Sequence, residues 1–467
     1  MTISETFLSV CQQLLPPRLQ AVSGRVRRAS LTTILNGSLS GVRSLFSFFT
    51  ISMLVGYLGK DSYGLCLTIT GMVTWLAVTQ GGLGQSLRNE LIRTRALSGD
   101  SDAPTRLFSS AFVFLLFLTL IVGILLTAIA WFLPWRTILN YPGFDSDPRY
   151  FRLILSSLWI ILLTVPLSMV RAAYSAFQLE YKLSPFLLAG LLTAFGATAF
   201  AVRNNIGETT AMAASLTANL IGLALGASFM PQLLGVRFSW REARMSDLRG
   251  LQKVGAWFFV IEVSMILIFQ VDVFLINLLR GQSDAAVFAL HSQLFVYIQA
   301  PVALLISPYC SAFGEAWHSG DKAWLRSWVR RLSIGTAGLT FFGVVIVILL
   351  GHAVMPRWSH GQVAWNASLA LALGANVIMQ SVTSVPAAAL GSLGLAREQA
   401  LVIIVQAIMN ALACYWFIHL FGIIGAALAS FITYSLTSAW YVPFKLRSVA
   451  WARQHCDPDP TVMRTTG

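Results

Sequence analysis

The feature that most constrains this chain is a series of long apolar segments that recur from residue 31 to residue 444. Each segment can cross a hydrocarbon core of about 30 Å as a helix, and a helix satisfies its own backbone hydrogen bonds, which lipid cannot do. Only 11% of the residues are charged, far fewer than in a soluble chain. The pattern predicts an all-α polytopic membrane protein of about 12 transmembrane helices, at residues 31–58, 63–86, 108–134, 151–172, 183–201, 210–233, 253–279, 285–312, 329–352, 362–388, 397–418 and 422–444.

The 32 Lys and Arg residues are distributed unequally between the two sides of these spans. The N-terminal segment and every second connection after it carry 24 of them, the opposite side carries 7, and Arg43 lies within a span. Because positive residues stay in the cytoplasm, both termini are predicted to be cytoplasmic. The net charge of +13 is therefore explained by topology, and we expect no nucleic-acid partner.

The first 30 residues contain four Arg but no apolar core followed by a cleavage site, so we expect no cleaved signal peptide. This segment is expected either to contact anionic membrane lipids or to remain a solvated tail. The five Cys are scattered without paired spacing, so neither a disulfide framework, a metal site nor a cofactor is expected.

Three landmarks recur at nearly constant offsets, which indicates two related halves. Gly59 matches Gly281, the Ser-Gly-Asp at 98–100 matches 319–321, and Pro134 matches Pro356. Six spans in each half give both halves the same orientation. The predicted parts are a cytoplasmic segment (1–30), an N-terminal six-helix lobe (31–233), a cytoplasmic linker (234–252), a C-terminal six-helix lobe (253–444) and a cytoplasmic tail (445–467).

The sequence resembles a known family. The segments GYLGKDSYG at 56–64 and GGLGQSLR at 81–88 are similar to the first hairpin of polysaccharide transporters, the O-antigen-type flippases of the multidrug/oligosaccharidyl-lipid/polysaccharide exporter superfamily. Similar patterns lie at 270–281, 313–317 and 421–429. The resemblance covers nearly the whole chain, but it consists of turn glycines and helix-end residues. It implies two six-helix lobes that form a V-shaped central cavity.

The resemblance also implies a function in a bacterial inner membrane. Members of this family move a lipid-linked oligosaccharide, typically on undecaprenyl pyrophosphate, from the cytoplasmic to the periplasmic leaflet by alternating access. The product would serve exopolysaccharide, O-antigen or capsule assembly, beside the polymerase and chain-length machinery of the same pathway. We expect a monomer, because the two halves already supply a complete pair of lobes.

Ionisable residues within a span are energetically costly and point to function. Arg43 in the first span and Glu262 in the seventh occupy nearly equivalent places in the two halves. They are predicted to face each other as an inner gate, in which Arg43 exchanges Glu262 for the substrate pyrophosphate. The alternative is that each is satisfied within its own lobe.

Asp272 and His291 lie at similar depth in the outer half of the membrane. Such a pair could bind and release H⁺ or Na⁺ and so drive transport. The alternative is that His291 is a packing residue and that Asp272 braces the hairpin.

The remaining candidates are polar residues beside or within later spans. Arg171 and Lys182 flank the turn between the fourth and fifth spans, where they either snorkel or attract the anionic head group. Gln380, Gln406 and Asn410 either bind sugar hydroxyls or hold helices together.

Two other functional classes are alternatives to a flippase. An enzyme would need a sizeable aqueous loop with clustered carboxylates or histidines, which the sequence lacks, and there is no Walker A pattern. An ion-coupled small-molecule or drug exporter of the same superfamily would have the same fold, so that alternative stays open.

Overall fold

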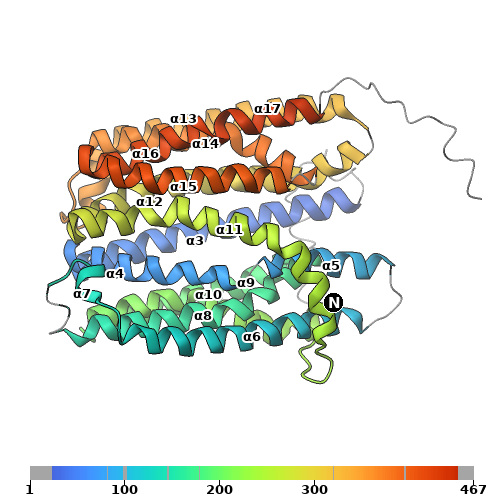
Figure 1. The fold of residues 1–467 in the computed structure, drawn as a ribbon, viewed down its shortest axis with the longest axis horizontal. Coiled ribbons are helices and arrows are strands. Elements are labelled where there is room, and N and C mark those ends of the chain that lie inside the picture. The colour runs from blue at the N-terminus through green and yellow to red at the C-terminus, as the bar shows by residue number, and fades with distance from the viewer. Residues whose placement is uncertain are drawn as a thin grey trace, which may run out of the picture.

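The computed structural model describes residues 24–450, apart from 81, 98–101, 143, 145–146, 178, 319 and 394–395. The described chain is helical and contains no strand (Figure 1). Its helices are α3 (Gly24–Leu58), α4 (Lys60–Thr74), the 3-10 helix η1 (Trp75–Gln80), α5 (Leu83–Leu97), α6 (Ala103–Ala130), α7 (Trp135–Ile138), α8 (Pro148–Ala176), α9 (Glu180–Arg203), α10 (Glu208–Leu234), α11 (Met245–Arg280), α12 (Gln282–His318), α13 (Lys322–Trp358), α14 (Ala367–Ser392), α15 (Ala396–Phe421), α16 (Ile423–Leu436) and α17 (Ser438–Ala450).

The predicted transmembrane architecture is confirmed. Eleven stretches of the described residues are long and apolar enough to cross a membrane. One of them, Gly41–Thr74, includes parts of both α3 and α4, so these stretches correspond to twelve membrane segments. The second segment is α4, η1 and α5 together, and the twelfth is α16 and α17.

Single glycines reverse the chain between three pairs of helices. Gly59, Gly281 and Gly422 have φ of 76°, 96° and 62°, a region in which a side chain is strained. Gly59 and Gly281 also share an extended ψ, 168° and 175°, so these two repeat landmarks have the same backbone geometry. We call the end of the bundle that holds these glycines the hairpin end, and the opposite end, where Gly24 and Ala450 lie, the terminal end (Figure 1).

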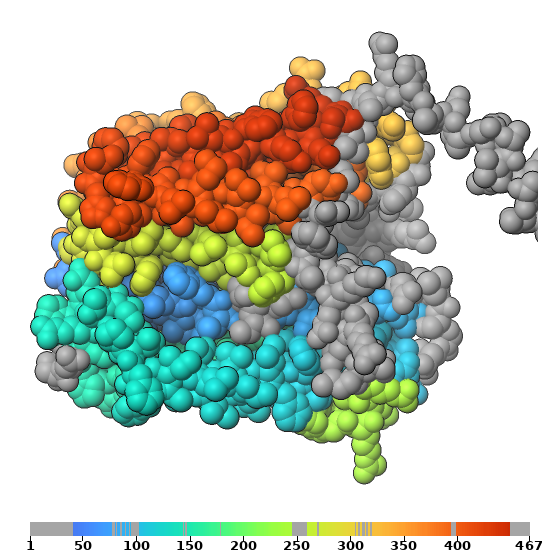
Figure 2. All heavy atoms as spheres, viewed as in Figure 1, coloured from blue at the N-terminus to red at the C-terminus, as the bar shows by residue number. Residues whose placement is uncertain are grey.

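The helices form two lobes, α3–α10 and α11–α17, each with its own apolar core. The lobes meet at the hairpin end, where a further core cluster combines residues of both, including Val55, Tyr63, Leu290 and Trp358. Figure 2 shows the surfaces of the two lobes in contact there. Gly64 of α4 lies so near α12 that a Cβ on it would be 2.1 Å from the Gln282 carbonyl oxygen. The hairpin end is therefore closed.

Candidate functional site

A cavity of about 540 Å³ lies beside α8, in the half of the molecule toward the terminal end. Four polar side chains of α8 line it: Thr164, Ser168, Arg171 and Ser175. Their spacing of four, three and four residues places them on one face of the helix. The rest of α8 is largely apolar, with Pro166 inside it. This polar stripe was missed in the sequence, although its helical period within an apolar span is a readable signal.

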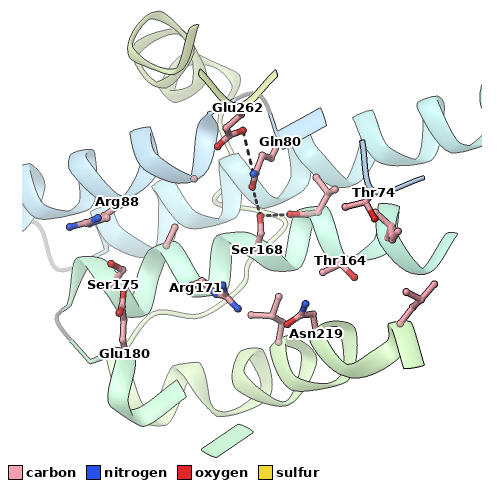
Figure 3. A pocket seen from close by; sticks show the side chains of 16 residues that line it. Thr74, Gln80, Arg88, Thr164, Ser168, Arg171, Ser175, Glu180, Asn219 and Glu262 are labelled. Carbon is pink, nitrogen blue, oxygen red and sulfur yellow. Dashed lines mark hydrogen bonds between the residues drawn. The ribbon is translucent and has the colours of Figure 1, made fainter. Parts of the chain in front are cut away.

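The other walls come from both lobes (Figure 3). Gln80 of η1, Arg88 of α5 and Asn219 of α10 belong to the first lobe, and Glu180 begins α9. Glu262 of α11 is the contribution of the second lobe to this lining. The cavity thus combines two arginines, two glutamates and several neutral hydrogen-bonding groups.

Glu262 is joined to the first lobe by a chain of hydrogen bonds. Gln80 Nε2 donates to Glu262 Oε2 at 3.4 Å, and Gln80 Oε1 accepts from Ser168 Oγ at 3.2 Å (Figure 3). The backbone N–H of Gly82, just before α5, also donates to the Glu262 carboxylate. The chain connects α11, η1 and α8 and so fixes the two lobes to each other beside the cavity. Gln80 was not among the predicted site residues.

Arg43 has a different partner from the one predicted. Its Nη2 donates to Asn219 Oδ1 at 3.5 Å, and Asn219 lines the cavity. The direct Arg43–Glu262 pair is therefore wrong for this conformation. The reason is that α3 packs against α9 and α10, whereas Glu262 faces η1. Arg43 and Arg171 lie close enough for their positive charges to repel each other.

The two flanking cations of the fourth and fifth spans are separated by the fold. Arg171 lines the cavity, whereas Lys182 is not among its lining residues. Glu180, which lies two residues before Lys182 on α9, does line the cavity. Lys182 is half-buried on another face of the same helix.

Asp272 lies in a buried polar cluster of the second lobe. Its side chain is 7% exposed, and its Oδ2 accepts a hydrogen bond from Ser430 Oγ of α16 at 3.1 Å. Asn410 and Cys414 of α15 are also near the carboxyl group, and Asn410 Oδ1 accepts from Thr433 Oγ1 at 3.1 Å.

His291 is not part of this cluster, so the predicted Asp272–His291 pair is not formed. Its Nδ1 donates to the Val287 carbonyl at 2.8 Å, and its Nε2 accepts from the Asn366 backbone N–H at 3.0 Å. The ring also stacks on Trp365. Both nitrogens of the neutral ring are thus occupied: Nδ1 bonds within α12, and Nε2 joins α12 to the start of α14, while Asp272 faces α15 and α16.

The three predicted sugar-binding residues divide into two groups. Gln380 is half-buried, accepting from Gln299 Nε2 at 2.9 Å and donating to Asn376 Oδ1 at 3.3 Å. Gln406 and Asn410 are 3% and 1% exposed, and their side-chain oxygens accept from Ser438 and Thr433. These two join α15 to the last membrane segment, which matches the helix-packing alternative.

No family model and no curated protein matches the sequence. Solved structures match along nearly all of it. A multidrug resistance MATE family transporter of the MOP superfamily in an inward-facing conformation has TM-score 0.70 and 13% identity, covering 90% of this chain and 99% of that chain. An outward-facing MATE structure has TM-score 0.64 and 15% identity, covering 94% and 98%. A MOP superfamily transporter from Pyrococcus furiosus, described by the reverse polarity of its binding pocket, has TM-score 0.59 and 11% identity, covering 90% and 95%.

These matches define the class of protein by its fold: a multi-pass membrane protein with the two-lobed architecture of a transporter. The fold is that of the MATE transporters of the MOP superfamily. At 11–15% identity the likeness concerns the fold, so the substrate must be inferred from the residues of the cavity.

Proposed function

We propose that this chain is a flippase, which moves an undecaprenyl-pyrophosphate-linked oligosaccharide from the cytoplasmic to the periplasmic leaflet by alternating access, for exopolysaccharide, O-antigen or capsule assembly. The observation that carries the proposal is the cluster of first-lobe arginines at the cavity beside α8. Arg171 and Arg88 line the cavity, and Arg43 is held at its wall by Asn219. With the predicted orientation, the cavity lies on the cytoplasmic side, where the lipid-linked substrate is made.

The electrostatics of the cavity favour a diphosphate. Arg43 and Arg171 repel each other, and this repulsion is stronger in a partly buried site than in water. An anion between them would replace repulsion by attraction, and each guanidinium can bind phosphate oxygens through paired hydrogen bonds. Thr164, Ser168 and Asn219 then offer hydrogen bonds to the first sugar.

Glu262 connects the substrate cavity to the second lobe. Its carboxylate lines the same cavity and holds Gln80 and Gly82. An arriving diphosphate repels this carboxylate and weakens the contact between α11 and the first lobe. Substrate binding would thereby change a contact between the lobes, and a ligand shifts a conformational equilibrium only through such a difference between the states.

The Asp272 cluster is the proposed coupling site. The Asp272 carboxyl group is buried, and Ser430, Asn410 and Cys414 beside it are neutral. A buried carboxylate is costly unless it is protonated or neutralised by a cation. Binding of H⁺ or Na⁺ would meet this need. His291 is left out of the proposed coupling site because both of its ring nitrogens are used in packing.

The experiment that tests the proposal deletes the gene in a strain without a redundant flippase and measures lipid-linked oligosaccharide on each face of the inner membrane. Complementation uses wild type, Arg43→Ala, Arg43→Lys and the control Arg203→Ala, an exposed residue at the hairpin end of α9. We expect accumulation on the cytoplasmic face that wild type and the control relieve and Arg43→Ala does not. Partial rescue by Arg43→Lys would indicate that charge matters more than paired hydrogen bonding. An unchanged distribution after deletion would rule out the lipid-linked substrate.

An ion-coupled exporter of small cationic molecules is the second candidate. The observation in its favour is the presence of Glu180 and Glu262 in the same cavity, since carboxylates attract cations. Reconstituted protein that expels a cationic dye under an H⁺ or Na⁺ gradient, and that loses this activity in Glu262→Gln but not in Arg43→Ala, would favour the exporter over the flippase.

A further inference from the structure

We propose that two straps, related by the internal repeat, hold the hairpin end closed and form the gate that must open for substrate release. In each strap, the segment after the third span of one lobe binds the first span of the other lobe. The proposal rests on the alternating access of the proposed function but not on the identity of the substrate.

The first strap is the segment 134–140, which follows α6 and contacts α11. Asn140 Nδ2 donates to the carbonyl oxygens of Asn277 and Leu278 at 3.2 and 3.5 Å. In return Asn277 Nδ2 donates to the Leu139 carbonyl at 2.8 Å, and Gln282 Nε2 donates to the Asn140 carbonyl at 3.4 Å. Asn277 is fully buried, so its bond to Leu139 lies inside the interface between the lobes.

The second strap is the segment 356–363, at the end of α13, which contacts α3. Trp358 Nε1 donates to the Phe48 carbonyl at 2.8 Å, and its ring stacks on Phe48 with centroids 4.8 Å apart. Ser52 Oγ donates to the Trp358 carbonyl at 2.7 Å and lies 3.2 Å from His360 Nε2. A Cβ on Gly56 would be 2.6 Å from the His360 ring, so this turn lies directly against α3.

The two straps are equivalent under the repeat. Pro134 and Pro356, which match in the sequence repeat, lie at the start of the two segments. Each segment also contains a non-glycine residue in the left-handed region, Asn140 with φ of 48° and His360 with φ of 50°. Such residues are uncommon, and here each lies where its strap contacts the opposite lobe. α3 and α11, the two helices that are bound, are the first spans of their lobes.

This exchange has a mechanical consequence. Because each lobe both supplies a strap and receives one, the lobes cannot separate at the hairpin end without breaking both sets of contacts. The contacts are neutral hydrogen bonds and one aromatic stack, which are individually weak and can be exchanged for water when the gate opens. The first and second straps lie on different segments, so their contributions should be independent.

The test measures the distance across the gate by double electron–electron resonance in nanodiscs. Spin labels are placed at Ile206 and Phe421, exposed residues at the hairpin end of the first and second lobe, in a chain whose five Cys are replaced by Ala. Asn277→Ala removes the bond to Leu139. Trp358→Phe removes the bond to Phe48 and keeps an aromatic ring.

Each strap variant has a matched control. The control for Asn277→Ala lies at the same end of the bundle, and the control for Trp358→Phe lies in the same lobe. Asn204→Ala removes an exposed Asn side chain that bonds within its own helix at the hairpin end. Trp440→Phe removes an exposed indole N–H that bonds to the Leu436 carbonyl at the end of α16, within the same lobe and the same membrane segment. Neither control alters a contact between the lobes.

We expect each strap variant to raise the open-to-closed ratio about fivefold, as loss of one net hydrogen bond does, and the double variant about 25-fold. The controls should leave the distribution unchanged. The proposed gate would be wrong if the strap variants gave the same distance distribution as wild type, or if the controls shifted the distribution as much as the strap variants do. Should a strap variant fail to fold, Ser52→Ala, which removes one bond of the second strap, must still raise the ratio. If the strap variants shift the distance distribution but the protein flips no lipid-linked oligosaccharide in cells, the proposed substrate would be wrong and the proposed gate would still be supported.

Discussion

The close approach of the two lobes at Gly64 predicts that Gly64→Ala disfavours the closed hairpin end. A Cβ at Gly64 would lie 2.1 Å from the Gln282 carbonyl oxygen, 2.9 Å from its carbon and 3.2 Å from the Ala286 Cβ. The neighbouring atoms are mostly backbone, which cannot turn aside as a side chain can. A normal contact is roughly 3.4 Å, so α4 and α12 must move apart by about 1 Å.

The magnitude follows from two opposing effects. Overpacking of this kind costs about 1–3 kcal/mol, and it acts only while the lobes are in contact. Replacing Gly by Ala within a helix contributes about 1 kcal/mol of stability in either state. The closed state should therefore lose about 1–3 kcal/mol relative to the open state, which raises the open-to-closed ratio by about 5- to 150-fold.

The assay is the distance distribution between labels at Ile206 and Phe421, together with the melting temperature. Gly71→Ala is the matched control, because Gly71 lies on the same helix and a Cβ there would have nothing within 4 Å. Gly64→Ala should shift the distribution toward longer distances, or lower the melting temperature if the open state is not reached. If Gly64→Ala behaves like Gly71→Ala in both measurements, the close contact between α4 and α12 is not a feature of the protein in the membrane.

Three further predictions concern the cavity and the buried carboxylate. Arg171→Ala should lower the rate of flipping at least about tenfold, since a charge-assisted hydrogen bond contributes roughly 1.5–3 kcal/mol, whereas Arg203→Ala should match wild type in the same leaflet assay. Glu262→Gln should bind a water-soluble pyrophosphate analogue about fivefold more tightly, because a repelling charge is removed, yet transport it more slowly; weaker binding in a fluorescence titration would contradict this. Asp272→Asn should abolish the dependence of transport on H⁺ or Na⁺ while substrate affinity changes little, and retained ion dependence in proteoliposomes would exclude this coupling site.

The fold was largely predictable because lipid restricts the chain to few solutions. Long apolar segments must be helices in a membrane, and the recurrence of Gly59 and Gly281 located two equivalent hairpins before their shared backbone geometry was known. The break at η1 was not predicted. The segment 75–80 is as apolar as its neighbours, and only the glycines at 81 and 82 signal that the helix stops.

The sequence singled out the ionisable residues within the spans, but neither their partners nor the neutral residues of the cavity, such as Gln80 and Ser168. Arg43, Glu262 and Asp272 stand out because an ionisable group in a span is costly. Their partners depend on the rotation of each helix and on packing between helices distant in sequence. Asn219 lies 176 residues from Arg43, and Ser430 lies 158 residues from Asp272. Matching depths alone suggested Arg43–Glu262 and Asp272–His291, and depth says nothing about which face of a helix a side chain occupies.

The difference between the two lobes follows from where their charges lie. Arg88, Arg171 and Glu180 of the first lobe line a cavity, together with Glu262 of the second, whereas Asp272 of the second lobe is buried against α15 and α16. Both sites touch α11, which carries Glu262 at one depth and Asp272 about three turns further along, and the first strap binds the end of that same helix at Asn277. A displacement of α11 would therefore change the contacts at the cavity, at the buried carboxylate and at the gate. In the proposed mechanism, α11 is the helix that would link substrate loading, ion binding and opening of the hairpin end.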